Sequence, residues 1–507
     1  MNLDLTNTRQ LLLALLPEVV LTAWAMILLV LVAWRHVTAR DVRVAGWTTL
    51  LALGSTALAV WWLWWNSAQV EGLTAMIAVD DFRWVADWLI LGAAGLTVCF
   101  SFGYLEREQL LIPEYQVLLV FATLGMMLMV GGNDLMVIFL GLELMSVSVY
   151  VLAALNRRSA RSAEAGLKYF LLGAFASAFL LYGIALCYGG TGTTNLTLIG
   201  VQVATLGLQS HPLLLIGIGL LLVGFGFKVA AVPFHMWAPD VYDGAPTPVT
   251  GFMATAVKAA AFAALARILV EAFSPSAVWP AIVTGLAVTT MIVGNLVALA
   301  QRSLKRMLAY SSIAHAGYLL VALAARNTQG ISAVLFYLTA YGLTSLAAFA
   351  LLAAKGRRGE SDVLIDDLAG LSHQRPGLAF ALTICMLSLL GFPGTAGFIG
   401  KWYILVAVVA GGKTWLAAVL VLTSLVSAGY YLPVIMAMYM KPAPFPQAHA
   451  GVDVDRWGRL GLALTITALI VFGVQPKRLL DLTTTSGAAL HPASQPFVAG
   501  QATTAGN

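Results

Sequence analysis

Six ionisable side chains lie within long apolar stretches of this sequence, where charge is costly. They are Glu143, Lys168, Lys228, Lys258, His315 and Lys401. Ionisable groups at membrane depth usually pair with one another and mark an ion or proton path. Burial favours the neutral forms of lysine and glutamate, whereas an ion pair favours the charged forms. A lysine whose carboxylate partner moves or takes up a proton can therefore release its own proton, so the six residues predict a proton-transfer row.

Several of these residues also have a simpler structural interpretation. Glu143 could be a helix-packing acid that a neighbour satisfies, and Lys258 could be a fixed partner for a buried carbonyl. Lys168 has a glutamate four residues before it, which is the spacing of a routine helix ion pair. His315 follows two serines by about one turn and could be a satisfied core histidine. Arginine would not serve in such a row, because it does not release its proton.

The clearest structural signal surrounds Lys228. The chain from Gly224 to Pro246 reads GFGFKVAAVPFHMWAPDVYDGAP, with glycines before the lysine and prolines after it. Proline removes a backbone donor and clashes with the preceding turn, so the helix should break just after the lysine. Such a break is tolerated in a bilayer only where protein or a water-filled cavity satisfies the freed backbone groups. His235, Asp240 and Asp243 follow the break, and we expect them to line an entrance or to hold the turn.

A second break precedes Lys401. The segment reads LSLLGFPGTAGFIGKWYIL, in which glycines and a proline interrupt the apolar run before the lysine. The two breaks are five predicted spans apart, and an odd offset inverts the second copy relative to the first. Paired interrupted helices in inverted repeats point to the ion site of many transporters. We therefore expect spans four to eight and nine to thirteen to form two inverted repeats.

The elements that position these residues are predicted membrane helices. The chain has 507 residues, of which 60% are hydrophobic and only 10% are charged, whereas about 25% of residues are charged in a soluble protein. Since a helix needs about 20 apolar residues to cross the hydrocarbon core, we predict an all-α polytopic membrane protein with about 14 transmembrane helices, of which helices 7 and 12 are discontinuous. The runs lie near 11–34, 46–65, 84–104, 115–131, 134–155, 164–188, 212–230, 248–270, 278–300, 304–325, 330–354, 377–406, 413–439 and 458–474.

Four regions follow from this pattern. They are an N-terminal three-helix region (1–110), a first repeat (111–271), a second, inverted repeat (272–440), and helix 14 with a flexible tail (441–507). Loops after odd-numbered spans, here called side A, hold seventeen lysines and arginines, among them Arg35, Arg357 and Arg358. The opposite loops, side B, hold seven, among them Arg83 and Arg267. Cytoplasmic loops carry this excess, so both termini should be non-cytoplasmic. We expect Glu18 at the outer interface and Asp134 as a helix cap.

The sequence lacks the motifs of nucleotide or redox chemistry. It has no phosphate-binding loop of the Walker type and no dinucleotide fingerprint. Cys99, Cys187 and Cys385 are far apart in apolar runs, which argues against an iron–sulfur or zinc site. We expect no cofactor or metal on this chain, and the net charge of +5 is not interpreted as affinity for nucleic acid. The energy for transport must come from an ion gradient or from a partner.

Three motifs together resemble one known family. FKVAAVPFHMWAPDVYDGAPTPVTGFMATAVKAAAF, preceded by GLELMSVSVYVLAAL and followed by GFPGTAGFIGKWYIL, resembles the subunit N family of NADH-quinone oxidoreductases, the respiratory complex I. The resemblance covers nearly the whole chain. Subunits L and M and the Mrp-type sodium/proton antiporters are similar but differ in the residues around the break. The family's key positions match Glu143, Lys228, Lys258 and Lys401.

The resemblance implies a proton-translocating membrane-arm subunit in a bacterial inner membrane, driven by quinone reduction elsewhere in the complex. NAD, FMN, iron–sulfur clusters and quinone would be bound by partner subunits, and subunits of the M and K types would be neighbours. The residues alone leave two alternatives open. One is a stand-alone cation/proton antiporter that uses the same lysines, and the other is a structural scaffold whose charges merely pair. An enzyme acting on lipid is not favoured, because the sequence shows no nucleophile–base cluster at an interface.

Overall fold

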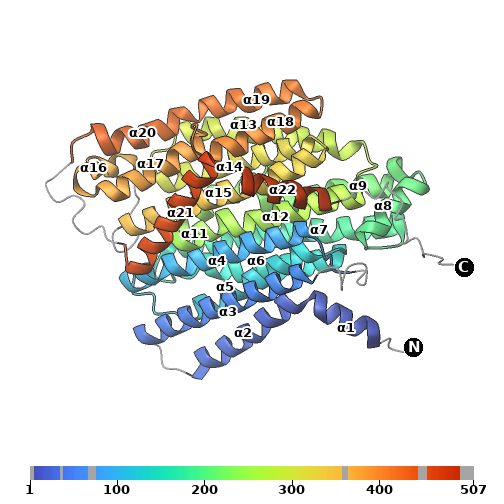
Figure 1. Ribbon diagram of the computed structural model, residues 1–507, viewed down its shortest axis with the longest axis horizontal. Coiled ribbons are helices and arrows are strands. Elements are labelled where there is room, and N and C mark those ends of the chain that lie inside the picture. Colours follow the sequence, from blue (N-terminus) through green and yellow to red (C-terminus); the bar gives the residue numbers. More distant parts are fainter. Residues whose placement is uncertain (1–4, 35–37, 67–75, 357–363, 444–453, 491–507) are drawn as a thin grey trace, which may run out of the picture.

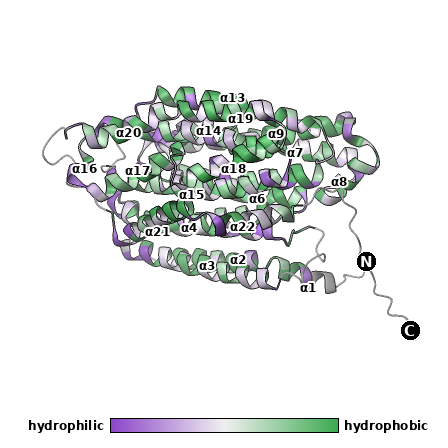
Figure 2. Ribbon diagram, turned by 45° about the horizontal axis from the view of Figure 1, so that its top comes forward, coloured by the Kyte–Doolittle hydropathy of each residue, from purple (hydrophilic) through white to green (hydrophobic). Residues whose placement is uncertain are grey.

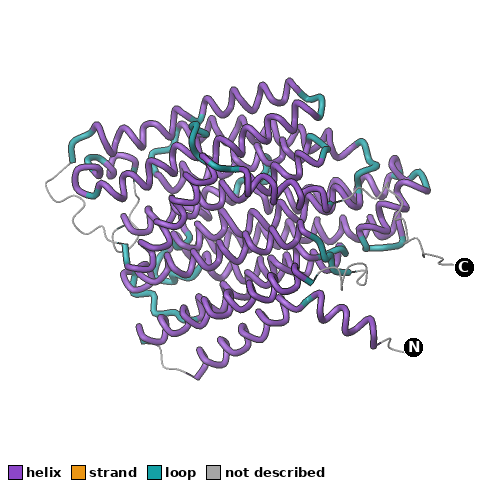
Figure 3. Tube along the Cα trace, viewed as in Figure 1, coloured by secondary structure: helices purple, strands orange, loops and turns teal. Residues whose placement is uncertain are grey.

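The computed structural model describes residues 5–34, 38–66, 76–356, 364–443 and 454–490. Within these ranges the regular structure is helical, apart from three isolated bridges between single residues. Most of the long helices run side by side along one common direction (Figures 1 and 3). The prediction of an all-α polytopic membrane protein is confirmed.

The N-terminal region contains four helices. They are α1 (Leu5–Ala14), α2 (Leu16–Trp34), α3 (Ala39–Trp65) and α4 (Asp81–Arg107). Side chains that cap free backbone N–H groups explain two of the starts. Thr38 and Asp41 form a capping box at the start of α3, and Asp80 accepts from the backbone N–H of Arg83 at the start of α4. Helix α4 packs against the rest of the molecule and joins this region to it.

The first predicted repeat begins with α5. Its helices are α5 (Glu114–Gly131), α6 (Leu135–Ala153), α7 (Ala160–Thr191), α8 (Leu196–Thr205), α9 (Pro212–Val229), α10 (Trp237–Gly244), α11 (Thr247–Phe252) and α12 (Lys258–Arg267). Two π-helical segments, Met253–Val257 and Ile268–Ala272, flank α12, so that Thr247–Ala272 forms one continuous apolar helix. Asp134 caps α6 by accepting from the backbone N–H of Met136, as predicted.

The second predicted repeat and the C-terminal region follow. Their helices are α13 (Val278–Leu299), α14 (Leu304–Ala324), α15 (Thr328–Lys355), α16 (Leu371–Gln374), α17 (Pro376–Leu390), α18 (Ala396–Ala410), α19 (Thr414–Val426), α20 (Ala428–Met440), α21 (Arg456–Val474) and α22 (Lys477–Ala489). Short 3-10 turns lie at Leu208–Ser210 and Ile365–Leu368.

Thirteen helices in the described ranges are long and apolar enough to cross a membrane. The twelfth span, predicted to be discontinuous, consists of two shorter apolar helices, α17 and α18, separated by a break. Hydrophobic residues dominate the long helices, and many hydrophilic ones lie towards the helix ends (Figure 2). The total of fourteen crossings stays a prediction.

Both predicted helix breaks are present. Helix α9 ends at Val229, one residue after Lys228, and Ala230 adopts a left-handed conformation with φ 58°. Helix α17 ends at Leu390, and Gly391 adopts φ 86°. A left-handed residue ends a helix because it turns the chain out of the helical path. The two breaks leave free carbonyl groups inside the bundle, and Lys401 uses those of the second break.

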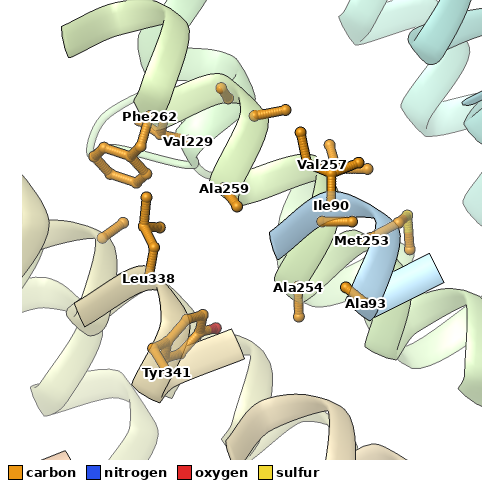
Figure 4. Packing of buried hydrophobic residues seen from close by; sticks show 14 of the residues in the cluster. Ile90, Ala93, Val229, Met253, Ala254, Val257, Ala259, Phe262, Leu338 and Tyr341 are labelled. Carbon is orange, nitrogen blue, oxygen red and sulfur yellow. The ribbon is translucent and has the colours of Figure 1, made fainter. Parts of the chain in front are cut away.

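The core lies where α4, the α11–α12 segment and α15 meet. Ile90 and Ala93 of α4 face Met253 and Val257, and Leu338 and Tyr341 of α15 lie close to Ala259 and Phe262 (Figure 4). These side chains are at most 8% exposed, Ala93 being the most exposed of them. The short side chains of this segment let the three helices approach closely, which places Lys258 in the most enclosed part of the molecule.

The structure differs from the predictions in three places. Glu18 lies in the first turn of α2, at the side B end of this helix, but its side chain is buried and pairs with Arg83 at 2.6 Å. Arg83 and Arg267 were counted with the side B loops, but both are enclosed within helices. Helix α22 was not expected. The predicted tail beyond Leu490 and three loop arginines (Arg35, Arg357 and Arg358) lie outside the described residues.

A buried row of lysines as the candidate functional site

Lys228 occupies an aromatic cage at the end of α9. Its side chain is buried, and Nζ donates a hydrogen bond to the hydroxyl of Tyr150 on α6 at 3.3 Å. The Nζ atom lies 5.1 Å from the ring centre of Tyr150, 5.4 Å from that of Tyr169 and 5.7 Å from that of Phe227. Aromatic faces attract a cation without neutralising it. The cage therefore holds a charged lysine without a fixed ion pair.

Glu143 lies two turns before Tyr150 on α6. Its carboxylate accepts a hydrogen bond from the hydroxyl of Ser177 on α7. It is near enough to Lys228 for an electrostatic interaction, although no direct ion pair joins them in the described structure. The hydroxyl of Tyr150 would lie 2.0 Å from a Cβ at Gly173, so glycine is needed to leave room for it. Glu143 and Lys228 therefore lie near one another without a direct ion pair, and the lysine is bonded to Tyr150.

Lys258 follows the π-helical segment Met253–Val257 and reaches α14. Its Nζ donates to the backbone carbonyl of Ser312 at 2.6 Å and to the hydroxyl of the same residue at 2.5 Å. The hydroxyl of Tyr341 donates to Ser312 Oγ at 2.8 Å. A π-helical turn shifts the register of later side chains, and such turns are frequent at functional sites. Lys258 is therefore held by two neutral acceptors. One of them is a buried carbonyl, as in the simpler structural interpretation of this lysine.

His315 lies one turn after Ser312 and connects two tyrosines. Its Nδ1 is 2.5 Å from the hydroxyl of Tyr337, and its Nε2 is 3.0 Å from the hydroxyl of Tyr431. Tyr431 also bonds to Ser311, which neighbours Ser312 in the chain. The ring of Tyr341, whose hydroxyl donates to Ser312, lies 5.0 Å from the His315 ring and so connects the Lys258 site with the histidine. Because a neutral histidine has one donor and one acceptor nitrogen, it can pass a proton between such hydroxyls.

Lys401 closes the row at the second helix break. Its Nζ donates to the carbonyl groups of Leu389 and Leu390, each at 2.9 Å, and to the hydroxyl of Ser424 at 2.7 Å. These carbonyls lie at the end of α17, where an interrupted helix leaves acceptors free. The same Nζ lies 4.9 Å from the ring centre of Tyr318, which contacts the His315 ring. The break therefore supplies the binding site of the lysine.

Lys168 lies apart from the row, at the side A end of the bundle. Its Nζ pairs with Glu164 at 2.7 Å and with Asp240 at 2.8 Å, and its side chain is 41% exposed. Asp240 also pairs with Arg306 at 3.1 Å. Partial burial works to raise the pKa of Asp240, but hydrogen bonds from Lys168 and Arg306 lower it below its usual value. These pairs tie α7 and α14 to the half-helix α10.

Residues around the turn after the first break hold its backbone. Lys305 donates to the carbonyl groups of Asp243 at 3.1 Å and of Ala245 at 3.0 Å. Ser303 bonds to the Asp243 side chain at 3.4 Å. This matches the expectation that the acids after the break hold the turn. The Nδ1 atom of His235 is buried without a hydrogen-bond partner in the described structure.

The sequence did not single out the hydroxyl groups that connect the row. Tyr150, Tyr318, Tyr337, Tyr341 and Tyr431 each contact a lysine or the histidine. A tyrosine in an apolar run gives no signal of function, because its ring is hydrophobic and is often buried for packing alone. Their spacing relative to the lysines across helices can be seen only in the folded chain.

Comparison with known proteins agrees with this geometry. Residues 132–427 match the family described as NADH:quinone oxidoreductase/Mrp antiporter, transmembrane. The NADH-quinone oxidoreductase subunit N of Trichlorobacter lovleyi is 45% identical over 468 residues, which cover 92% of this chain and 95% of the relative. The chain belongs to the subunit N family. All six predicted site residues lie within the matched range.

Solved structures agree with membership of the subunit N family. A chain of respiratory complex I from Thermus thermophilus with bound aureothin is 36% identical, with a TM-score of 0.78, and the match covers 93% of this chain and 100% of that one. A chain of the Mrp complex from Dietzia has a TM-score of 0.83 at 21% identity over 95% of this chain and 98% of that one. The second likeness is one of fold alone. The sequence identities thus favour complex I over the Mrp alternative.

Proposed function

We propose that this chain translocates protons as a membrane-arm subunit of a redox-driven NADH-quinone oxidoreductase. The observation that carries the proposal is the row of buried lysines held by neutral acceptors. Lys228, Lys258 and Lys401 each donate to hydroxyl or carbonyl groups. In the described part of the chain, no carboxylate lies within ion-pair distance of any of the three. A lysine held in this way can lose its proton without leaving a buried carboxylate unpaired.

The row works as a series of switched acid–base groups. When Glu143 is ionised, its field stabilises a proton on Lys228. When Glu143 takes up a proton, or is held by Ser177 as in the structure, Lys228 becomes a proton donor. The proton passes towards Lys258, whose serine partner lies next to the Ser311–Tyr431–His315 contacts. Lys401, at the second break, gates release to side B.

Entry is proposed from side A, by way of the segment after the first break. Lys168, Asp240 and Arg306 surround this region, and a partly exposed group there can exchange protons with water. Side A faces the cytoplasm, so both termini lie on the opposite side. Release near Lys401 then moves protons outward across a bacterial inner membrane.

The chain depends on partners for energy. We assign NAD, FMN, iron–sulfur clusters and quinone to other subunits of the complex, and place subunits of the M and K types as neighbours. Within this chain, residues 1–110 form the N-terminal region, 111–271 and 272–440 form the two inverted repeats, and 441–507 complete the C-terminal region. In support of the repeats, α5 packs on α6 in the first repeat as α13 packs on α14 in the second.

Substitution of Lys228 tests the function. In the intact complex reconstituted in liposomes, Lys228→Met should abolish the share of NADH-driven pumping that this chain carries. Lys228→Arg should do the same because arginine keeps the charge but does not release its proton. Lys441→Met is the matched control, since Lys441 is exposed and pairs with Asp366 at 2.6 Å. Reduction of an artificial electron acceptor measures assembly. Pumping that survives in both Lys228 variants would reject the proposal and favour a scaffold role.

A stand-alone antiporter is the second candidate, favoured by the likeness of fold to the Dietzia Mrp chain. The purified chain in liposomes should then exchange Na⁺ for protons without any partner. We expect no such exchange, because in a redox-driven pump the row changes state only when a partner drives it. Transport by the isolated chain that Lys228→Met abolishes would support the antiporter.

A further inference from the structure

A second group of buried charges lies outside the lysine row. It joins the side B ends of α2, α4 and the α12 segment, and we name it the α4 cluster. Its members are Glu18, Asp80, Arg83, Asp87, Arg267 and Glu271. The proposed proton route passes through none of these residues, and only Glu18 was singled out from the sequence, as an acid at the outer interface. Buried ionisable groups in a membrane protein are costly, so a role for them has to be considered.

In the outer part of the cluster, one arginine pairs with two carboxylates. Arg267 donates to the two oxygens of Asp80 at 2.7 and 2.9 Å and to Glu271 at 2.7 Å. The Arg267 side chain is 1% exposed, whereas those of Asp80 and Glu271 are 19% and 14% exposed. These two carboxylates therefore connect the cluster with water on side B.

The inner part centres on Arg83, which is fully enclosed. Its Nη1 donates to the carbonyls of Ala14 at 3.1 Å and Ala78 at 2.9 Å, and its Nη2 donates to Glu18 at 2.6 Å. Only its Nε points towards Asp87, at 3.5 Å, and forms no hydrogen bond. The guanidinium is thus committed to Glu18 and to the backbone.

Among the described residues, Asp87 has a buried carboxyl group without a hydrogen bond, and its nearest cationic atom is Arg83 Nε at 3.5 Å. It is 0% exposed, and neither of its oxygens has a hydrogen-bond partner in the described structure. The cluster sets four carboxyl groups against two guanidinium groups, so ionising all four would bury a formal charge of −2. An ionised carboxylate without donors is among the most costly groups to bury, and such a group takes up a proton instead.

We infer that Asp87 is a proton-holding site, neutral at rest, which exchanges its proton with side B through the Asp80–Glu271 end of the cluster. On release, the O–H bond of Asp87 breaks, the proton passes to water on side B, and the carboxylate shares the charge of Arg83 with Glu18. A proton from the protein interior or from side B restores the acid. The part of this inference that concerns transport rests on the proposed function. The resting protonation does not.

The infrared spectrum of the intact complex tests the protonation. A protonated carboxyl group in an apolar site gives a C=O stretching band that shifts in D₂O. We expect Asp87→Asn to remove one such band and Asp81→Asn, on the same helix, to retain it, since Asp81 instead accepts from Trp64 at 2.7 Å. Asp87→Glu, which keeps a carboxyl group, should move the band rather than remove it. An unchanged band in Asp87→Asn would overturn the inference.

Pumping tests the exchange. A positioned acid–base group accelerates proton transfer by roughly 10²-fold or more, so Asp87→Asn should slow the share of NADH-driven pumping that this chain carries by about that factor. Asp81→Asn should leave it unchanged. If Lys228→Met stops pumping but Asp87→Asn does not, the exchange fails while the proposed function stands. If Lys228→Met leaves pumping intact, the proposed function itself fails.

Discussion

At the scale of single residues, the lysines of the row are surrounded by groups that tolerate either protonation state. Lys228 has aromatic faces and one hydroxyl, Lys258 has a serine, and Lys401 has two carbonyls and a serine. A carboxylate in direct contact would hold a lysine charged, and breaking such a pair in the interior costs about 3–5 kcal/mol. Neutral acceptors avoid that cost, so the row can change charge during turnover.

Tyr150 should matter through its hydroxyl alone. Tyr150→Phe keeps the ring that packs against Lys228 but removes the acceptor at 3.3 Å. A hydrogen bond to a charged group contributes about 1.5 kcal/mol at the lower end of its range, which corresponds to roughly tenfold in rate. We expect the share of pumping that depends on Lys228 to fall by about that factor, measured as the initial rate of proton uptake into vesicles.

The control for this variant is Tyr182→Phe on the neighbouring helix α7, where the tyrosine is 60% exposed. The complex that carries Tyr182→Phe should pump protons at the parent rate. Equal rates for Tyr150→Phe and Tyr182→Phe would show that the ring, and not the hydroxyl, is what the Lys228 site requires.

The burial of Lys228, Lys258 and Lys401 could be predicted, because a charged residue in an apolar run is costly unless it has a role. Glu143 was singled out for the same reason. The tyrosine and serine partners could not be predicted, since hydroxyl groups are common in membrane helices and their contacts span several of them. The role proposed for Asp87 could not be predicted for another reason. This residue lies in the N-terminal region that the repeat argument set aside, and Glu18, which pairs with the same Arg83, was assigned to the interface.

At the scale of helices, glycines bring backbones into contact in the first helix pair of each proposed repeat, α5–α6 and α13–α14. In α5 and α6, a Cβ at Gly141 would lie 2.5 Å from the backbone nitrogen of Met129. In α13 and α14, a Cβ at Gly294 would lie 2.6 Å from the backbone nitrogen of Ala314. Small residues allow this close approach in membrane proteins. The shared feature supports the proposal that the repeats have a common design.

Gly141→Ala should therefore destabilise the α5–α6 pair and displace Glu143, two residues further along α6. The added methyl group meets backbone atoms that cannot turn aside, and overpacking of this kind costs about 1–3 kcal/mol. We expect a lower apparent unfolding temperature in detergent and reduced pumping.

Gly95→Ala is the matched control, because no atom lies within 4 Å of a Cβ at that glycine in α4. It should keep or slightly raise the unfolding temperature, since alanine favours helices more than glycine does. The interpretation of the α5–α6 contact is wrong if both variants unfold at the same temperature as the parent.

The helix breaks followed from glycine and proline spacing, but other features of the elements could not be predicted. The π-helical turn before Lys258 has no sequence signal, because alanine-rich and β-branched residues also form ordinary helix. Helix α22 was missed since its lysine, arginine, aspartate and threonines interrupt the apolar pattern. Gly473 of α21 lies against Gly394 and Thr395 in the second break, and Gly487 of α22 lies against Ser332 of α15. Packing therefore fixes where these two helices lie, although hydropathy predicted that α21 is a span.

At the scale of the whole molecule, the buried arginines change how the loop charges are counted. Arg83 and Arg267 were assigned to side B, but both are enclosed in the α4 cluster. The positive-inside rule counts charges in loops and near the ends of membrane helices, so the buried side chains Arg83, Arg267 and, on side A, Lys305 carry less weight in this count. The orientation stays a proposal.

Thiol labelling can test this orientation with two positions that one helix separates. Arg158 precedes α7 and Thr205 ends α8 after it, so the 32-residue helix α7 places them on opposite sides of the membrane. Both residues are exposed, while Cys187 and Cys385 are buried and Cys99 lies within a membrane helix. A membrane-impermeant thiol reagent should label Arg158→Cys only in inside-out vesicles and Thr205→Cys only in right-side-out vesicles. The parent chain measures the background from Cys99. The reverse pattern would place side A outside the cell, and because the proposed entry lies at the side A end, it would also reverse the direction in which the row moves protons.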